Sequence, residues 1–261
     1  MQVIIQDSPE KAVALTSKII ADQLQSKPNS VLGLATGRTM ESLYDVLAAM
    51  QRKGEIDFSL TTTFNLDEYV GLAGSDKNSY RYYMNEKLFN RVNIDPRNTH
   101  LPDGLAEDLE DEADYYEYLI EDAGGIDLQL LGIGNSGHIG FNEPLSPLLS
   151  RTRAVSLTPA TIAQNSPLFE RPEDMPRFAL TMGVGTILEA EQCLMLVTGA
   201  AKADILAKAV EGPITSMISA TALQLHSDCV VIADADAAAQ LTQKDYYHWN
   251  FAHAPEWASY Q

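Results

Sequence analysis

The sequence is poor in cysteine and has no long hydrophobic run. Only two cysteines, Cys193 and Cys229, occur among 261 residues, and both lie in apolar, strand-like runs. We therefore expect two buried thiols in a reduced, cytoplasmic compartment and no structural zinc site. No stretch approaches about 18 uncharged apolar residues, so no membrane-spanning helix is expected. The first residues, MQVIIQDSPEKA, lack the basic start and long apolar run of a signal peptide and predict a first strand.

Cations are scarce relative to acidic residues. The chain has 18 lysines and arginines against 36 aspartates and glutamates, which gives a formal net charge of −18. This charge opposes nonspecific binding to nucleic acids, because such binding depends on basic patches. An anionic ligand would therefore need cations concentrated at one place in the fold.

Strand-like apolar runs alternate with amphipathic helical stretches along the chain. Runs such as VLGLAT and LQLLGIG are almost wholly apolar, as strands buried on both faces of a sheet should be. The alternation predicts an α/β fold, Rossmann-like, with three αβα layers and a mostly parallel central sheet. Because 45% of residues are hydrophobic and no repeat or linker occurs, we expect a single domain over residues 1–261. Helices are expected near residues 9–25, 40–54, 79–89, 107–122, 200–210 and 236–241.

The segment 157–178, LTPATIAQNSPLFERPEDMPRF, interrupts this alternation. It holds four prolines with polar residues between them, which predicts irregular structure. A compact domain seldom spends about 20 residues on a loop without a use, so we expect a lid over a binding site. A wandering surface connection is the alternative.

Small, polar and titratable residues follow four separate strands. TGRT follows VLGLA, NLDEY follows TTTF, GNSGHIGFNEP follows LQLLGI, and TGAAK follows CLMLV. In open α/β sheets, ligands bind beyond the carboxyl ends of the strands. We therefore expect these four segments to form one composite site.

The first of these segments is a candidate anion site. Thr36, Gly37, Arg38 and Thr39 open a helix, where a glycine turn can present backbone N–H groups to a phosphate. An ordinary strand-to-helix turn with a threonine cap is the alternative, and the GxxxxGK of a P-loop is absent. Lys202 follows another strand and supplies a second cation. Together they could make a basic pocket in an acidic protein.

Two further segments carry candidate acid–base groups. Asp67 follows an apolar strand, a rigid position for a catalytic carboxylate, although it could instead cap a turn or helix. His138 follows a glycine and has a carboxylate, Glu143, five residues further on. A histidine held by a carboxylate can relay protons near neutral pH. A core histidine with a satisfied hydrogen bond is the alternative. The GxSxG elbow of esterases does not occur.

Nine motifs of the chain occur in the order seen in one known family. They are TGRT, FNLDEYVGL, NSYRYYM, GNSGHIGFNEP, SRTR, ALTMGVGTILEAE, TGAAK, AVEG and LQLH. The resemblance that they carry spans roughly residues 2–245. With these motifs the sequence resembles the glucosamine-6-phosphate deaminases (isomerases). The FNLDEY and GHIGFNEP motifs together are highly specific to that family. The 6-phosphogluconolactonases share that fold and a GxxxGH loop, but they are not expected to carry these two motifs in this form.

The resemblance implies an aldose–ketose isomerisation coupled to loss of ammonia. Glucosamine 6-phosphate and water would give fructose 6-phosphate and ammonia, with no metal or organic cofactor. Asp67 matches the base that moves the C2 proton to C1. His138 matches the residue that assists ring opening, and Glu143 matches the carboxylate that works with it. The residues matching the phosphate site are Gly37, Thr39 and Lys202.

The chain departs from the family at several of these places. Ser136 stands where many members carry Asp or Asn; a serine can orient His138 or a substrate hydroxyl but supplies no negative charge. Pro167 occupies the position of the family's lid arginine. We hypothesise that Arg38, where a small residue is usual, replaces that arginine, because a guanidinium can grip phosphate through two N–H bonds. Arg171 is the competing candidate, and a solvent-facing Arg38 is the third possibility.

Other functions stay open from the sequence. The substrate could be the galactosamine epimer, the enzyme could be a lactonase of the same fold, or the protein could be a regulator that binds sugar phosphates without turnover. The expected partner is in each case a small sugar phosphate, with no nucleic acid or membrane, and a homo-oligomer is possible. The aromatic tail from Tyr246 to Gln261 is expected to pack on the body or on a neighbouring subunit.

Overall fold

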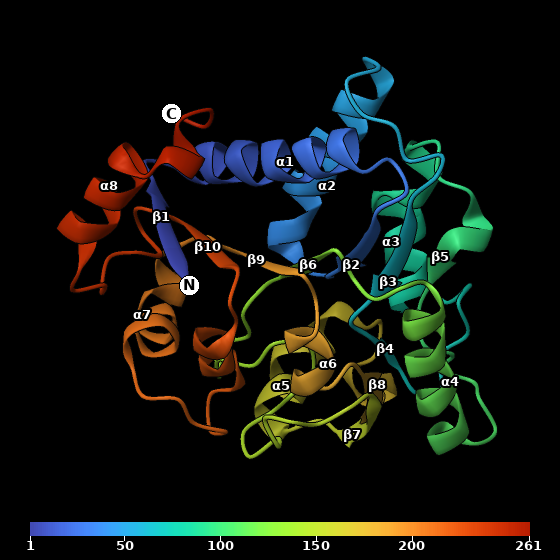
Figure 1. The fold of residues 1–261 in the computed structure, drawn as a ribbon. Coiled ribbons are helices and arrows are strands. Elements are labelled where there is room, and N and C mark those ends of the chain that lie inside the picture. Colours follow the sequence, from blue (N-terminus) through green and yellow to red (C-terminus); the bar gives the residue numbers. More distant parts are fainter.

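A seven-stranded sheet forms the centre of the molecule in this computed structural model, which describes residues 1–261 (Figure 1). Every neighbouring pair of its strands is parallel. The two central strands, β2 and β6, are buried at every residue, as their apolar runs predict. The strand order is β1 (Gln2–Gln6), β10 (Cys229–Asp234), β9 (Gln192–Val197), β6 (Leu128–Leu131), β2 (Val31–Leu34), β3 (Thr62–Asn65) and β5 (Thr99–His100).

Helices cover both faces of this sheet. In Figure 1, α1 and α2 lie above it, while α6 and α7 lie below it. The layers confirm the expected Rossmann-like αβα fold with a parallel central sheet. The helices are α1 (Pro9–Ser26), α2 (Arg38–Arg52), α3 (Tyr80–Lys87), α4 (Leu109–Asp122), α5 (Pro159–Asn165), α6 (Val184–Leu188), α7 (Ala203–Glu211) and α8 (Lys244–His253).

The order of the strands reverses between β2 and β6. From β2 the chain moves outward through β3 to β5, then returns to β6 on the other side of β2 and moves outward through β9 to β10. Such a switch point opens a crevice at the carboxyl ends of the two central strands, where ligands of open α/β sheets bind. The loops after β2 and β6 therefore meet there.

A second, three-stranded sheet was not expected from the sequence. The chain leaves the large sheet after Asn65, and Asp67 begins β4 (Asp67–Tyr69), which pairs antiparallel with β8 (Phe178–Thr181). β8 also pairs with β7 (Arg153–Ser156). Asp67 thus lies on a short strand of its own and not in the turn after the preceding strand. The sequence did not predict this strand, because a strand of only three residues carries little sequence pattern.

Two expectations of local structure were wrong. Segment 157–178 is partly helical: Thr158 caps α5 through its side chain and Pro159 takes the first helical position, which suits proline because no N–H is needed there. Two 3₁₀ turns, Ser166–Leu168 and Pro172–Asp174, follow. The expected helix at 236–241 is a series of turns, because the Asp234 carboxylate accepts from the Ala237 N–H at 2.7 Å and holds the chain in a tight bend.

Other expectations are confirmed. Cys193 and Cys229 are free and buried on neighbouring strands. The aromatic tail packs on the body of the same chain, with Trp257 buried against the core.

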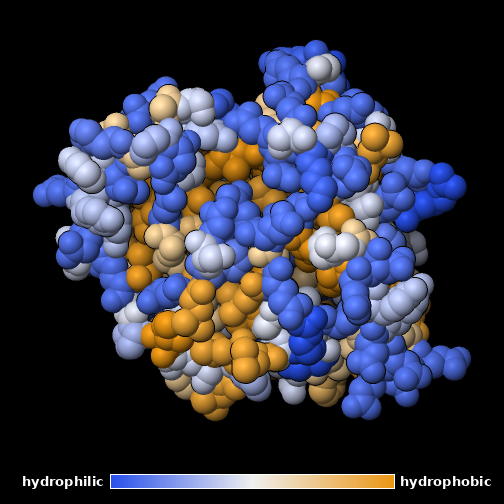
Figure 2. Space-filling model, viewed as in Figure 1, coloured by the Kyte–Doolittle hydropathy of each residue, from blue (hydrophilic) through white to orange (hydrophobic).

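None of the helices combines the length and apolarity needed to cross a bilayer. Most of the face in Figure 2 is hydrophilic, apart from an apolar area toward its lower part.

Candidate active site

A pocket of about 700 Å³ opens at the switch point of the large sheet. Its size is within the range of small-molecule sites. The segments that follow β2, β3, β6 and β9 all line it, so the four sequence segments do form one composite site. Seven of the nine expected site residues line the pocket: Thr36, Gly37, Arg38, Thr39, Asp67, His138 and Lys202. The remaining two, Ser136 and Glu143, contact the His138 ring.

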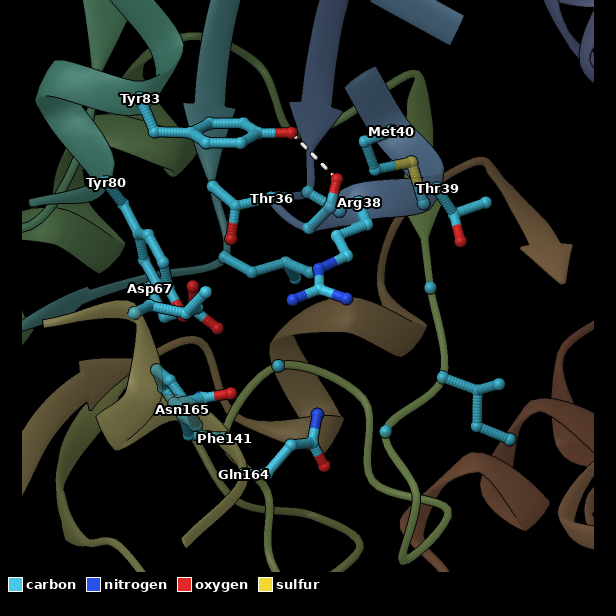
Figure 3. Close-up of a pocket in the computed structure, with 18 of the residues that line it drawn as sticks. Thr36, Arg38, Thr39, Met40, Asp67, Tyr80, Tyr83, Phe141, Gln164 and Asn165 are labelled. Carbon is cyan, nitrogen blue, oxygen red and sulfur yellow. Dashed lines mark hydrogen bonds between the residues drawn. The ribbon is translucent and has the colours of Figure 1, made fainter. Parts of the chain in front are cut away.

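Asp67 is a buried carboxylate that faces the pocket (Figure 3). Only 6% of the residue is exposed. Burial, with a smaller contribution from the charge of Glu68, raises the pKa of Asp67 to about 8. A carboxylate held this far above its usual range is a stronger proton acceptor once ionised, which is what a general base near neutral pH requires.

Glu68, its neighbour on β4, points away from the pocket and stabilises the backbone. Its carboxylate accepts hydrogen bonds from the N–H groups of Tyr69, Tyr80 and Arg81 at 2.8–2.9 Å. Tyr80 and Arg81 open helix α3, so Glu68 holds the start of that helix. Glu68 therefore shares with the N-cap residue Ser79, which accepts from the Tyr82 N–H at 3.0 Å, the capping role that Asp67 could have taken.

His138 is held between a carboxylate and a hydroxyl. Its Nδ1 lies 3.3 Å from Oε2 of Glu143 and 2.8 Å from Oγ of Ser136. Although burial acts in the opposite direction, hydrogen bonds from His138 and Thr161 and the charge of His138 lower the pKa of Glu143 to about 2. An ionised carboxylate can only accept, so it favours a proton on Nδ1 and leaves Nε2 for a substrate group.

The absence of a side chain at Gly134 leaves room for the His138 ring. A Cβ at this position would lie 2.1 Å from Nε2 of His138, far inside van der Waals contact. The Gly134 N–H also donates to the His138 carbonyl at 2.9 Å and so closes the loop around the ring. The glycine spacing of GNSGH therefore serves the close approach of backbone and ring.

Cations gather at the pocket as the charge argument required. Lys202 donates from Nζ to the Ile133 carbonyl at 2.8 Å and to Oδ1 of Asn135 at 2.6 Å, and burial lowers its pKa. Figure 3 shows the Arg38 guanidinium extending into the space that Asp67, Gln164 and Asn165 also face. Arg38 makes no ion pair with a carboxylate, so its charge is available to a ligand.

Arg171 does not reach this pocket. Its guanidinium makes two bonds to the Asp174 carboxylate at 2.7 and 2.8 Å on the exposed 3₁₀ turn. Pro167 also lies outside the lining residues. Of the two candidate arginines, Arg38 therefore lines the pocket and Arg171 does not.

Several lining residues escaped the sequence argument. Tyr80 and Tyr83 of α3 line the pocket, and Tyr83 donates to the Gly37 carbonyl at 2.8 Å, the dashed line in Figure 3. Asn165 of α5 donates at 3.1 Å to the Tyr69 hydroxyl, which also accepts from Tyr80 at 3.2 Å. Only the three-residue spacing of the two α3 tyrosines, which places both on one helix face, could have indicated them.

The pocket thus combines a buried carboxylate of raised pKa, a histidine–carboxylate pair and two cations. A base and a second proton-transfer group facing one space can move protons on a small substrate, and the cations can bind an anionic group of that substrate. The structure brings together no group of three or more His, Cys, Asp or Glu side chains suited to a metal ion.

Comparison with known proteins finds relatives over most of the chain. Residues 6–231 match the family described as glucosamine-6-phosphate isomerases/6-phosphogluconolactonase. A glucosamine-6-phosphate deaminase from Shewanella woodyi is 50% identical over 247 residues, covering 95% of this chain and 94% of that protein. One from Hahella chejuensis is 49% identical over 249 residues, covering 95% of each.

Solved structures agree with these relatives. A monomeric glucosamine-6-phosphate deaminase superposes with a TM-score of 0.90 at 42% identity, covering 92% of this chain and 100% of that one. A 6-phosphogluconolactonase from Trypanosoma cruzi superposes with a TM-score of 0.74 at 19% identity, covering 92% of this chain and 97% of that one, which shows a shared fold. The chain therefore belongs to the family of glucosamine-6-phosphate isomerases and 6-phosphogluconolactonases.

Proposed function

We propose that the protein is a cytoplasmic glucosamine-6-phosphate deaminase, which converts glucosamine 6-phosphate and water to fructose 6-phosphate and ammonia. Relatives of this activity are 46–50% identical over nearly the whole chain. The observation that carries the proposal is the shared pocket of Asp67, His138 and Lys202. A base, a proton relay and a phosphate-binding cation are the three groups that this reaction needs around a six-carbon sugar phosphate.

Ring opening is the step assigned to His138. Nδ1 is engaged by Glu143 and Ser136, so Nε2 takes the proton of the anomeric hydroxyl. The C1–O bond to the ring then breaks, the C1 oxygen becomes a carbonyl, and the ring oxygen receives a proton. The Glu143 carboxylate stabilises the positive charge that the imidazole carries in between.

Asp67 acts on the open chain. It takes the C2 proton, whose electron pair forms a C1–C2 double bond while the C1 carbonyl oxygen takes a proton from the ammonium group at C2. The same carboxyl returns its proton to C1, which leaves an iminium ion at C2. Water adds to this carbon and nitrogen leaves as ammonia with the remaining proton, so atoms and charge balance. One carboxylate can serve both carbons because they lie on one face of a planar intermediate.

Substrate binding explains how Asp67 can act as a base although its pKa is raised. A pKa of about 8 leaves much of this carboxyl protonated at neutral pH in the free protein. The amino group at C2, when protonated, places a positive charge beside it and favours the ionised form. The base is thus activated where and when the substrate binds.

An ammonia-release assay with both epimers tests the proposal. We expect ammonia and fructose 6-phosphate from glucosamine 6-phosphate, with a smaller kcat/KM for the galactosamine epimer. Hydrolysis of 6-phosphogluconolactone with no ammonia from either amino sugar would identify a lactonase instead. Tight binding of glucosamine 6-phosphate with no turnover would identify a regulator.

A further inference from the structure

The carboxylate that partners His138 is itself held from segment 157–178. Oε1 of Glu143 accepts from the hydroxyl of Thr158 at 3.1 Å and from the Thr158 N–H at 3.3 Å. Its Oε2 lies 3.3 Å from Nδ1 of His138 without forming a hydrogen bond, and the Thr161 side chain of the same helix also contributes to the low pKa of this carboxyl. One oxygen thus binds the start of α5 while the other faces the imidazole, so Thr158 fixes the rotation of the carboxylate.

The Thr158 hydroxyl has two tasks. It accepts from the Thr161 N–H at 3.3 Å, which caps α5, and its own proton can be donated to Oε1 of Glu143 at 3.1 Å or to the Thr161 hydroxyl at 3.3 Å, of which Glu143 is the nearer. A hydroxyl can do both, because it has one donor and two acceptor sites. Glu143 is buried, with 6% of the residue exposed, so water cannot readily take over the lost hydrogen bond.

We propose that Thr158 is a positioning residue for the His138–Glu143 pair, so that this pair is complete only when α5 is seated on the pocket. The proposal rests on the proposed deaminase function and assigns to segment 157–178 a catalytic task beyond covering the substrate. When Thr158 withdraws, Glu143 is free to turn, and the neutral hydroxyl of Ser136 is left as the partner of Nδ1. Ring opening then slows because the developing imidazolium lacks its counter-charge.

Other charged groups around the pair do not replace Glu143. Asp67 of β4 faces the pocket, and Lys202 binds Ile133 and Asn135 on the loop before His138. Arg153 of β7 bonds to Asn142, next to Glu143, and Arg38 extends from α2. Lys202, Arg38 and Arg153 are cations, which oppose a proton on His138, and no second carboxylate is in contact with its ring.

Three variants at one position separate positioning from helix capping. Thr158→Val removes the hydroxyl at nearly constant volume. Thr158→Ser keeps both tasks. Thr158→Asp retains a good helix cap but turns a donor into a like charge beside Glu143. Ser8→Ala removes the equivalent cap of α1, where Ser8 accepts from the Lys11 N–H at 3.3 Å far from the pocket, and is the matched control.

We expect kcat for glucosamine 6-phosphate to fall about tenfold or more in the Val and Asp variants, with KM nearly unchanged, and to recover within about threefold in the Ser variant. The acidic limb of the kcat/KM profile should move to lower pH in the Val variant. The NMR resonances of the His138 ring, recorded at one fixed pH in the ligand-free protein, should move in the Val variant and return toward the parent positions in the Ser variant. Ser8→Ala should change neither the pH profile nor these resonances.

Equal losses in the Val and Ser variants, or an Asp variant as active as the parent, would overturn the positioning role. An unchanged acidic limb of the kcat/KM profile in the Val variant would do the same. These outcomes differ from failure of the proposed function, in which the parent protein releases no ammonia from either amino sugar phosphate while the His138 ring resonances still respond to loss of the Thr158 contact.

Discussion

Asp67 and Glu68 are adjacent carboxylates with opposite environments. Successive side chains of a strand point to opposite faces, so β4 sends Asp67 into the pocket and Glu68 toward the start of α3. The sequence left two roles open for Asp67, a catalytic carboxylate or a cap. It could not predict which acid would be the cap, because that depends on α3, which begins twelve residues later and folds back onto β4.

Replacing Asp67 by Asn tests its role as the base. We expect turnover to fall by about 10²–10⁴-fold while the sugar phosphate still binds, because the amide keeps the volume but cannot accept the C2 proton. Activity and binding affinity are measured separately, the latter by calorimetry. Turnover within a few-fold of the parent would remove Asp67 as the base.

The same variant should be more stable than the parent at high pH. The native pKa of Asp67, about 8, lies above its ordinary value of 3.8, so between these pH values the native state holds a proton that the unfolded state has lost. Stability from this group is therefore present below pH 4 and is lost as the pH rises to 8. Thermal unfolding of Asp67→Asn should match the parent near pH 4 and gain about 2–4 kcal/mol above pH 8.

Arg38 is the second residue whose role a substitution can test. Its guanidinium enters the pocket without a carboxylate partner, so Arg38→Ala should raise KM for glucosamine 6-phosphate about tenfold and leave kcat within about threefold. Arg171→Ala is the matched control, because that arginine is bound to Asp174 outside the pocket. If both variants keep the parent KM, Arg38 faces solvent during catalysis.

At the scale of elements, the pocket depends on how α3 and segment 157–178 meet β4. Helix α3 presents Tyr80 and Tyr83, and the segment reaches β4 through the hydrogen bond from Asn165 to Tyr69. Leu157, Phe169 and Met175 also pack with Tyr69 in a small core of their own. The sequence predicted the long helices because their periodic patterns are strong, but short elements such as β4 and α5 are fixed by these tertiary contacts.

Glu68→Gln should weaken the junction of β4 and α3. Glutamine has one acceptor oxygen and brings an NH₂ toward three N–H donors, so we expect a loss of about 1–3 kcal/mol in the free energy of unfolding. Because the Glu68 charge contributes to the raised pKa of Asp67, its removal should also move the Asp67 limb of the pH–rate profile to lower pH.

Glu112→Gln is the control for this change. Glu112 also accepts a backbone N–H, from Asp103 at 2.8 Å, but it lies in the first turn of α4 away from the pocket. Its replacement should leave the pH–rate profile unchanged. A Glu68 variant whose stability falls with no shift in the profile would mean that the charge does not reach Asp67.

At the scale of the whole molecule, the acidic chain surrounds a pocket that carries the two cations Arg38 and Lys202, and a third lining cation, Lys77, is paired with Glu170. The sequence supported the large sheet and the meeting of four strand ends, since buried parallel strands and the residues that follow them are local signals. It left the C-terminal tail undetermined. Aromatic residues suit a body or a subunit interface equally well, and only the course of α8 along β1 decides between them.

Trp257 anchors this tail, and its loss should cost stability without affecting catalysis. Its ring is buried against Phe251 and Tyr260, and Nε1 donates to Oε1 of Gln2 on β1, which ties the two ends of the chain together. Trp257→Ala leaves a cavity and should lower the free energy of unfolding by about 3–5 kcal/mol. Because β1 is the edge strand far from the β2–β6 crevice, kcat/KM at a temperature where both proteins are folded should stay within about twofold.

Trp249→Ala is the matched control: that ring is 58% exposed, so its removal should cost less than about 1 kcal/mol. Equal losses of stability in the two variants would show that the tail is held by the helix as a whole and not by the buried ring.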